Sequence, residues 1–165
     1  MPDFQIRPAT EKDISLLLYF IKELAAYERL SDKVVATEES LRKHLFGFQP
    51  RAEVLLAYWQ NEPVGFAIIF HDFSSYLGAP GLYLEDLFIK PGYRGRGFGR
   101  MIFAHLAELA MTRECSRFEW SVLDWNEPAI KFYESIGAKA LDDWRVYCLT
   151  ENALTDLAAS SRDKN

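Results

Sequence analysis

The sequence is poor in cysteine, and the two cysteines it has lie far apart. Cys115 and Cys148 form no C-x-x-C pair and match no metal-binding spacing. The chain therefore has no disulfide framework, and we expect two reduced thiols in a reducing compartment. The histidines His44, His71 and His105 are scattered along the chain and indicate no metal site.

Long apolar runs and an excess of positive charge are also missing. No stretch approaches the length that spans a bilayer, and no N-terminal run has the pattern of a signal peptide. We therefore expect a cytoplasmic protein without a membrane partner. The formal net charge of −5 argues against nonspecific binding to nucleic acid. It is compatible with a cationic partner, although most soluble proteins of this charge use it for solubility alone.

What the chain does have is the composition of one globular domain. Its 165 residues are 49% hydrophobic and 26% charged, and 15% are aromatic, which suits a packed sheet or a ligand cleft. No repeat, low-complexity tract or linker divides it. We expect a single domain over residues 1–150, followed by a polar C-terminal tail over residues 151–165 that frays.

Hydrophobic periodicity predicts strands and helices that form a mixed α/β fold. Strands are expected at 4–7, 53–59, 64–70, 82–89, 117–123 and 144–149. Helices are expected at 14–30, from 37 onward, at 100–113 and at 126–137. The segment 71–80 contains Ser, Gly and Pro and is predicted to be a loop. This order favours one central sheet with helices packed on its faces.

The most informative segment is a strand that runs through a glycine-rich turn into a helix. Glycines let backbone N–H groups approach a phosphate, and the start of a helix adds a partial positive charge. Arg94, Arg96 and Arg100 add three full charges, so we expect a pyrophosphate or a ribose phosphate here. The turn has neither the Gly-Lys-Ser/Thr of a Walker A loop nor the G-x-G-x-x-G of a dinucleotide fold. The alternative is an ordinary glycine turn that caps a helix.

Three motifs in order resemble those of one known family. Arg94-x-x-Gly97-x-Gly99 resembles the acetyl-CoA signature of the GNAT superfamily of N-acetyltransferases. The opening Ile6-Arg-Pro-Ala-Thr10 with Asp13 and the later Asn126-Glu-Pro-Ala-Ile-Lys-Phe-Tyr-Glu-Ser-Ile-Gly137 resemble two further motifs of that fold. The resemblance implies a single, mostly antiparallel sheet that is splayed at the acetyl-CoA site and flanked by helices.

Within that superfamily the chain is most similar to the diamine (spermidine/spermine) and thialysine acetyltransferases. The residues that carry this similarity are Lys22-Glu-Leu-Ala, Tyr27-Glu28, Tyr83-Leu-Glu-Asp86, Arg94-Gly-Arg-Gly-Phe-Gly99, Trp125-Asn-Glu-Pro128 and Trp144-Arg145. The similarity implies acetyl transfer from acetyl-CoA, by direct attack, to the amino group of a small cationic amine. It also implies a homodimer.

Acetyl transfer needs an amine that has lost its proton, and an alkyl ammonium has a pKa of about 10. It also needs protonation of the departing thiolate. The resemblance implies that Glu85 is the base, acting through water, and that Tyr133 is the acid. Alternation along a strand sends Glu85 and Asp86 to opposite faces unless a bulge intervenes. The competing interpretations are an ion pair of Glu85 with an arginine and a core-packing role for Tyr133.

The resemblance also implies two sets of binding residues and no metal. Pantetheine is expected along the strand edge and the diphosphate on the glycine turn. The expected coenzyme contacts are Leu87, Phe88, Ile89, Arg94, Gly95, Arg96, Gly97, Phe98, Gly99, Arg100 and Asn126. The expected amine contacts are Tyr27, Glu28, Glu85, Asp86, Asp142 and Trp144. Glu28 has an equally simple interpretation as the solvated end of a helix.

The segment His71–Gly81 departs from the family pattern. In the spermidine/spermine enzyme this loop is shorter and carries a tryptophan that lines the polyamine site; here Tyr76 or Phe73 is the candidate substitute, which counts against polyamines. This leaves thialysine-like amino acids and other small amines open as acceptors. Two rival functions also stay open: acetylation of a peptide or protein amine, and a non-catalytic module that senses acetyl-CoA.

Overall fold

The computed structural model describes residues 3–160. The chain divides into two compact units, one ending at Leu123 and the other beginning at Asp124, and each is described by itself. Among the described residues, no helix is both long enough and apolar enough to cross a membrane.

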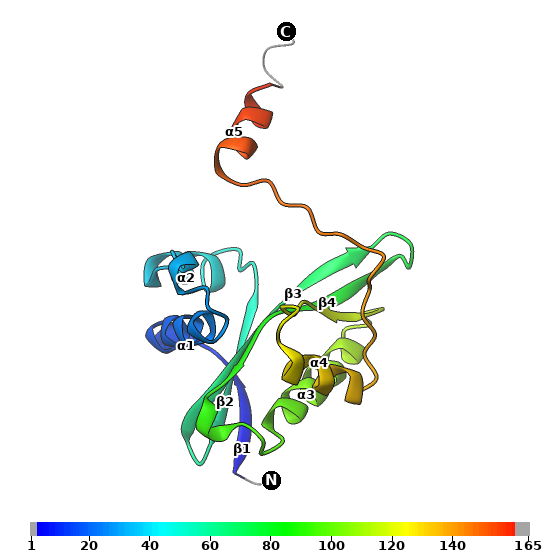
Figure 1. Cartoon of the computed structure of the whole chain (residues 1–165). Helices are drawn as coiled ribbons and strands as arrows, with labels where there is room; N and C mark the ends of the chain where they lie inside the picture. Colours follow the sequence, from blue (N-terminus) through cyan, green and yellow to red (C-terminus); the bar gives the residue numbers. More distant parts are fainter. Residues whose placement is uncertain (1–2, 161–165) are drawn as a thin grey trace. The chain divides into compact units, whose positions relative to one another are not determined.

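The first unit is built on a five-stranded sheet with the strands in the order β1-β2-β3-β4-β5 (Figure 1). The strands are β1 (Phe4–Pro8), β2 (Glu53–Trp59), β3 (Glu62–Ser74), β4 (Ala79–Ile89) and β5 (Phe118–Trp120). The first three pairs of neighbours are antiparallel, and β4 and β5 are parallel. The predicted mixed α/β fold with a mostly antiparallel sheet is confirmed.

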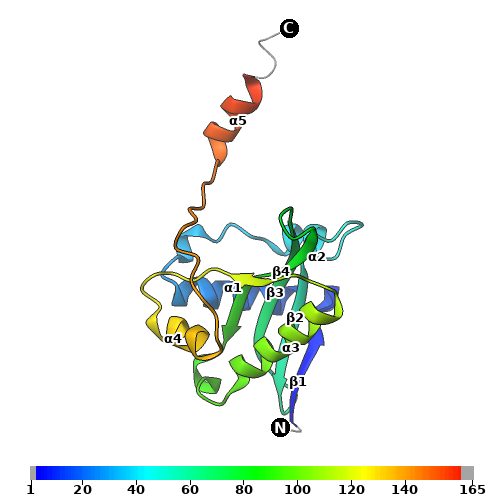
Figure 2. The same ribbon diagram turned by 90° about the vertical axis from the view of Figure 1, so that its right-hand side faces the viewer.

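Helices cover both faces of this sheet (Figures 1 and 2). Helices α1 (Ile14–Tyr27) and α2 (Glu38–Leu45) lie on one face, and α3 (Phe98–Thr112) lies on the other. Three short 3-10 helices, Glu11–Asp13, Ser31–Lys33 and Pro91–Tyr93, complete the connections. The helices form where the apolar spacing predicts them, because one stripe of each must be buried.

The core on the α1 side joins that helix to the three middle strands. Its buried members are Leu17, Phe20, Leu24, Val54, Leu56, Phe66, Ile68 and Phe88. The rings of Phe20 and Phe66 stack with centroids 5.6 Å apart. On the other face, Phe98 at the start of α3 is buried and stacks on Phe4 of β1 at 4.6 Å. These contacts fix α1 against β2, β3 and β4, and the start of α3 against β1.

The predicted loop over 71–80 is wrong, since most of it is strand. Pairing between β3 and β4 continues to Ser74 and Ala79, and only residues 75–78 form the turn. Gly78, at φ +64°, closes the turn by donating its N–H to the Ser74 carbonyl at 2.8 Å. Ser, Gly and Pro correctly predict a turn in this segment, but the residues on either side of the turn pair with each other as antiparallel strands.

The second unit contains α4 (Glu127–Ser135) and α5 (Glu151–Ala159). The strand predicted at 144–149 is absent: these residues are exposed and have no regular structure. A strand needs a neighbour to satisfy its backbone groups, and none of the described residues of this unit provides one. Helix α5 lies in the predicted tail, with Thr150 as its N-cap and with Ala and Leu residues that favour a helix. Residues 161–165 lie outside the described part.

Candidate active site

A β-bulge in β4 lies at the centre of the candidate site. Asp86 pairs with Ile68 of β3, whereas the next residue of β3, Ile69, pairs with Leu84. Glu85 is therefore the extra residue of β4, without a counterpart on β3. The bulge interrupts the alternation that would have sent Glu85 and Asp86 to opposite faces.

On its other side, β4 is paired only up to the bulge. Strand β5 runs beside it at Leu82, Tyr83 and Leu84, and no strand within residues 3–160 pairs with this edge beyond Leu84. Backbone N–H and C=O groups along an open strand edge are a template for another extended chain. The sheet is therefore splayed beside the expected pantetheine segment, Leu87–Ile89.

Three carboxylates gather at the bulge. Burial, together with the nearby charges of Glu85 and Glu28, raises the pKa of Asp86 to about 6. Burial also raises the pKa of Glu28, which is the C-cap residue of α1. Glu85 itself is exposed. The cluster gives the site a negative potential that favours a cation such as an alkyl ammonium.

The glycine turn connects the end of β4 to the start of α3. Gly95 and Gly97 have φ values of +74° and +84°, in the left-handed region that favours glycine. Gly97 is the N-cap of α3, and the first N–H groups of a helix have no acceptor within it. The glycine turn into a helix is present where the sequence predicts it, and its two left-handed glycines and helix N-terminus have the geometry that suits an anion.

The arginines of this turn do not all have the same surroundings. Arg94 donates from Nε to the Ile89 carbonyl at 2.8 Å. Its guanidinium lies 4.4 Å from the ring centroid of Tyr27 and 5.5 Å from that of Phe88. Arg96 instead lies over the ring of Tyr93, at 5.1 Å. The structure thus brings together Arg94 and Tyr27, two predicted site residues that are distant in the sequence.

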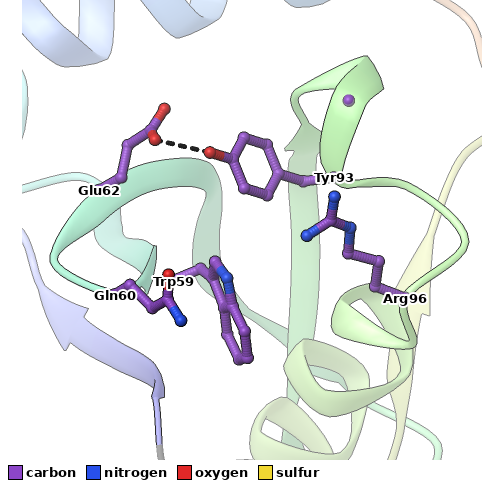
Figure 3. A pocket seen from close by; sticks show the side chains of 6 residues that line it. Trp59, Gln60, Glu62, Tyr93 and Arg96 are labelled. Carbon is purple, nitrogen blue, oxygen red and sulfur yellow. Dashed lines mark hydrogen bonds between the residues drawn. The ribbon is translucent and has the colours of Figure 1, made fainter.

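A cavity of about 420 Å³ adjoins the turn on the side of Arg96. It is lined by Trp59, Gln60, Glu62, Gly92, Tyr93 and Arg96 (Figure 3). The Tyr93 hydroxyl donates to Glu62 at 2.6 Å, and this hydrogen bond lowers the pKa of Glu62 and raises that of Tyr93. Lys90 adds an ion pair to Glu62 at 3.2 Å. These contacts fix the β2–β3 turn to the segment that precedes the phosphate turn.

An ion-pair network, which the sequence did not reveal, holds the start of β5 beside the hairpin. Arg117 contacts Asp72 of β3 and pairs with Glu119 of β5 at 2.7 Å. The Asp72 hydrogen bond raises the pKa of Arg117. A side chain at Gly81 would meet the Asp72 carboxylate at 2.1 Å, so the network requires glycine there. The sequence signal was an isolated glycine inside a strand.

The remaining predicted residues belong to the second unit. Asn126 is the N-cap residue of α4, and its carbonyl accepts from Ala129 and Ile130 at 3.1 and 3.0 Å. Tyr133 lies within α4, with its ring centroid 5.6 Å from that of Phe132. Asp142 and Trp144 are exposed. The roles assigned to these four residues stay predictions.

Comparison with known proteins is consistent with this geometry. Residues 19–138 match the sequence profile of the acetyltransferase (GNAT) family. The chain is 37% identical over 169 residues to a thialysine N-epsilon-acetyltransferase of Sus scrofa, covering 96% of this chain and 99% of the relative. It is 29% identical to an L-ornithine N5-acetyltransferase of Arabidopsis thaliana, covering 91% and 86%. A solved integron cassette protein from the mobile metagenome of V. cholerae superposes with a TM-score of 0.78 at 29% identity, covering 94% of this chain and 98% of that one.

Proposed function

Because the chain belongs to the GNAT family of acetyltransferases, we propose that it transfers the acetyl group of acetyl-CoA to a small cationic amine. A diamine, a polyamine or a thialysine-like amino acid fits this description. The observation that carries the proposal is the open edge of β4, which begins at the carboxylate cluster and ends at the anion-binding turn.

The donor would lie along this edge. The diphosphate sits on the turn from Gly95 to Arg100, where left-handed glycines and the start of α3 present N–H groups. The pantetheine arm pairs with the backbone of Leu87–Ile89 as an added strand. The family resemblance assigns Asn126 a further contact with the coenzyme. This binding mode brings the thioester beside the bulge.

The acceptor would be held by negative charge and an aromatic ring. Glu28, Glu85 and Asp86 attract the ammonium group, and Tyr27 adds an aromatic surface for its alkyl chain. The two enzymes named in the comparison act on terminal amines of amino acids, according to their names. Terminal amines of this kind carry a positive charge at neutral pH. The family resemblance assigns Asp142 and Trp144 further contacts with the amine.

The reaction then requires three proton transfers. Glu85, which is exposed and can reach water, accepts the ammonium proton through a water molecule. The free amine attacks the thioester carbonyl, so a C–N bond forms and the C–S bond breaks. N–H groups of the open β4 edge stabilise the carbonyl oxygen as it gains charge. Tyr133 protonates the departing sulfur. The nitrogen loses its second proton to solvent as the amide forms, and the Tyr133 phenolate regains a proton from solvent.

Thiol release from acetyl-CoA, measured against a panel of amines, tests the proposal. The panel contains thialysine, ornithine, lysine, putrescine, spermidine and a peptide with a free N-terminus. We expect saturable turnover with at least one small cationic amine and none with an uncharged alcohol of similar size. Turnover confined to the peptide favours a protein acetyltransferase, and tight acetyl-CoA binding without turnover favours a sensor.

We also propose, on the family resemblance alone, that the active form is a homodimer. Light scattering at assay concentration measures its mass directly. A monomer that retains full activity contradicts this part of the proposal.

A further inference from the structure

The arginine that opens the phosphate turn makes contacts unlike those of a phosphate ligand. Arg94 donates its backbone N–H to the Pro91 carbonyl at 3.2 Å and its Nε to the Ile89 carbonyl at 2.8 Å. The second bond fixes the plane of the guanidinium. The same group then covers the ring of Tyr27 at 4.4 Å. Arg94 is thus anchored to the end of β4 and to the end of α1.

Tyr27 is also held by the core. Its ring packs against the cluster that includes Phe20, Phe66 and Phe88, so the core and the Arg94 guanidinium both contact it. Cation–π contacts prefer arginine, whose planar group stacks on an aromatic face. Removing the guanidinium therefore frees the last residue of α1 from one of its fixed neighbours.

The end of α1 also carries part of the acidic pocket. Glu28 follows Tyr27 directly as the C-cap residue, and its charge acts on Asp86 at the bulge. A displacement of Tyr27 would therefore move a carboxylate of the pocket. Binding sites depend on such supporting contacts, since a small displacement of a binding group weakens its interaction with the substrate.

We infer that Arg94 is a positioning residue that links the phosphate turn to the amine pocket through Tyr27, rather than a ligand of the diphosphate. This inference rests on the proposed function. The two arginines of this turn then have different roles. Arg94 positions the residues that bind the amine. Arg96, which lies over Tyr93 at the cavity beside the turn (Figure 3), contacts the phosphates.

Kinetics with two acetyl donors distinguish a phosphate-binding role from a role in positioning the amine pocket. Acetyl-CoA carries the diphosphate and S-acetylpantetheine does not, so a phosphate contact matters only with the first. We expect Arg94→Gln to raise the KM for the amine roughly 3- to 10-fold with either donor, and to change the KM for acetyl-CoA less than about twofold. Arg96→Gln, the matched variant, should show the reverse: a raised KM for acetyl-CoA and no change with S-acetylpantetheine.

A double-mutant cycle tests the route through Tyr27. In a Tyr27→Leu background, which keeps an apolar side chain but removes the ring, Arg94→Gln should change the amine KM less than about twofold further. Arg94→Lys keeps the charge but not the planar stack and should behave like Arg94→Gln. If Arg94→Gln does not show a wild-type-like thermal transition, Arg94→Lys replaces it in the same measurements.

Two results would overturn the inference. One is an Arg94 effect confined to the KM for acetyl-CoA and absent with S-acetylpantetheine. The other is full additivity of the Arg94 and Tyr27 substitutions. Both results require a wild-type protein that is active. If the wild type acetylates no amine with either donor, the proposed function is contradicted, and not only the role of Arg94.

Discussion

Glu85 and Asp86 are neighbours in β4, but only Asp86 has a partner on β3, because Glu85 is the extra residue of a bulge. Their charges interact strongly enough to contribute to the raised pKa of Asp86. The bulge thus produces an exposed carboxylate beside a half-buried one whose pKa is about 6. Each of these two carboxylates leads to a separate prediction.

Asp86→Asn should stabilise the protein at neutral pH. The pKa of Asp86 rises from 3.8 to about 6 on folding, so folding favours the protonated form and the charged form destabilises the folded state. The penalty develops between about pH 4 and pH 6 and is complete above that range. The upper bound of the gain in free energy of unfolding is about 3 kcal/mol at pH 7.5, falling toward zero below pH 4. Urea unfolding at both pH values measures it.

The control for this variant is Asp32→Asn, whose side chain is 73% exposed. It should change the free energy of unfolding by less than about 0.5 kcal/mol at either pH. A gain for Asp86→Asn that is the same at pH 4 and pH 7.5, or a loss at pH 7.5, would show that Asp86 is not destabilised by its charge.

Glu85→Gln should reduce turnover at pH 7 by roughly 100-fold or more, since it removes the proposed base. The deficit should shrink as the pH rises toward 10, where more of the amine is already free. The measurement is a pH profile of kcat/KM for the amine, with Glu108→Gln on the exposed face of α3 as the control. An equal loss at every pH argues against a base.

Tyr133→Phe should lower kcat by roughly 10- to 100-fold and leave the affinity for acetyl-CoA within about twofold, because only the acidic hydroxyl is lost. Steady-state rates and a binding titration together make the comparison. Tyr147→Phe, at a ring that is 87% exposed, should change neither quantity. An unchanged kcat in Tyr133→Phe removes this residue as the acid.

Gly97→Ala should weaken the phosphate turn. The added Cβ would meet no atom within 4 Å, so the cost comes from φ alone, which is +84°. A left-handed alanine costs about 1–2 kcal/mol, and the strain should lower Tm and raise the KM for acetyl-CoA. Gly92→Ala is the control, because that glycine also has open space around it but no left-handed φ. Equal behaviour of the two variants would show that the turn does not depend on this conformation.

Local patterns were enough to predict most of the framework. Richness in Val, Leu, Ala and aromatic residues predicted β2 with its observed bounds, Glu53–Trp59, and the glycine spacing predicted the turn before α3. These features depend on the residues within each segment. The strand predicted at 144–149 was wrong, because residues that favour a strand do not by themselves supply the partner strand that it needs.

The decisive details of the site depend on contacts between distant segments. Position 85 became the bulge through the register of β3 against β4, which the sequence of β4 does not determine. The stacking of Arg94 on Tyr27 and the pairing of Arg117 with Asp72 likewise follow from tertiary packing. From the sequence, the first arginine could only be predicted to bind phosphate.

Calorimetric titration of the wild-type protein with acetyl-CoA tests most directly whether the turn at 94–100 and the open edge of β4 hold the donor. We predict saturable one-site binding with a Kd between about 1 μM and 1 mM, weakened in Gly97→Ala and unchanged in Gly92→Ala. If neither acetyl-CoA nor free coenzyme A binds the wild-type protein, the proposed donor site and the reaction built on it are both wrong.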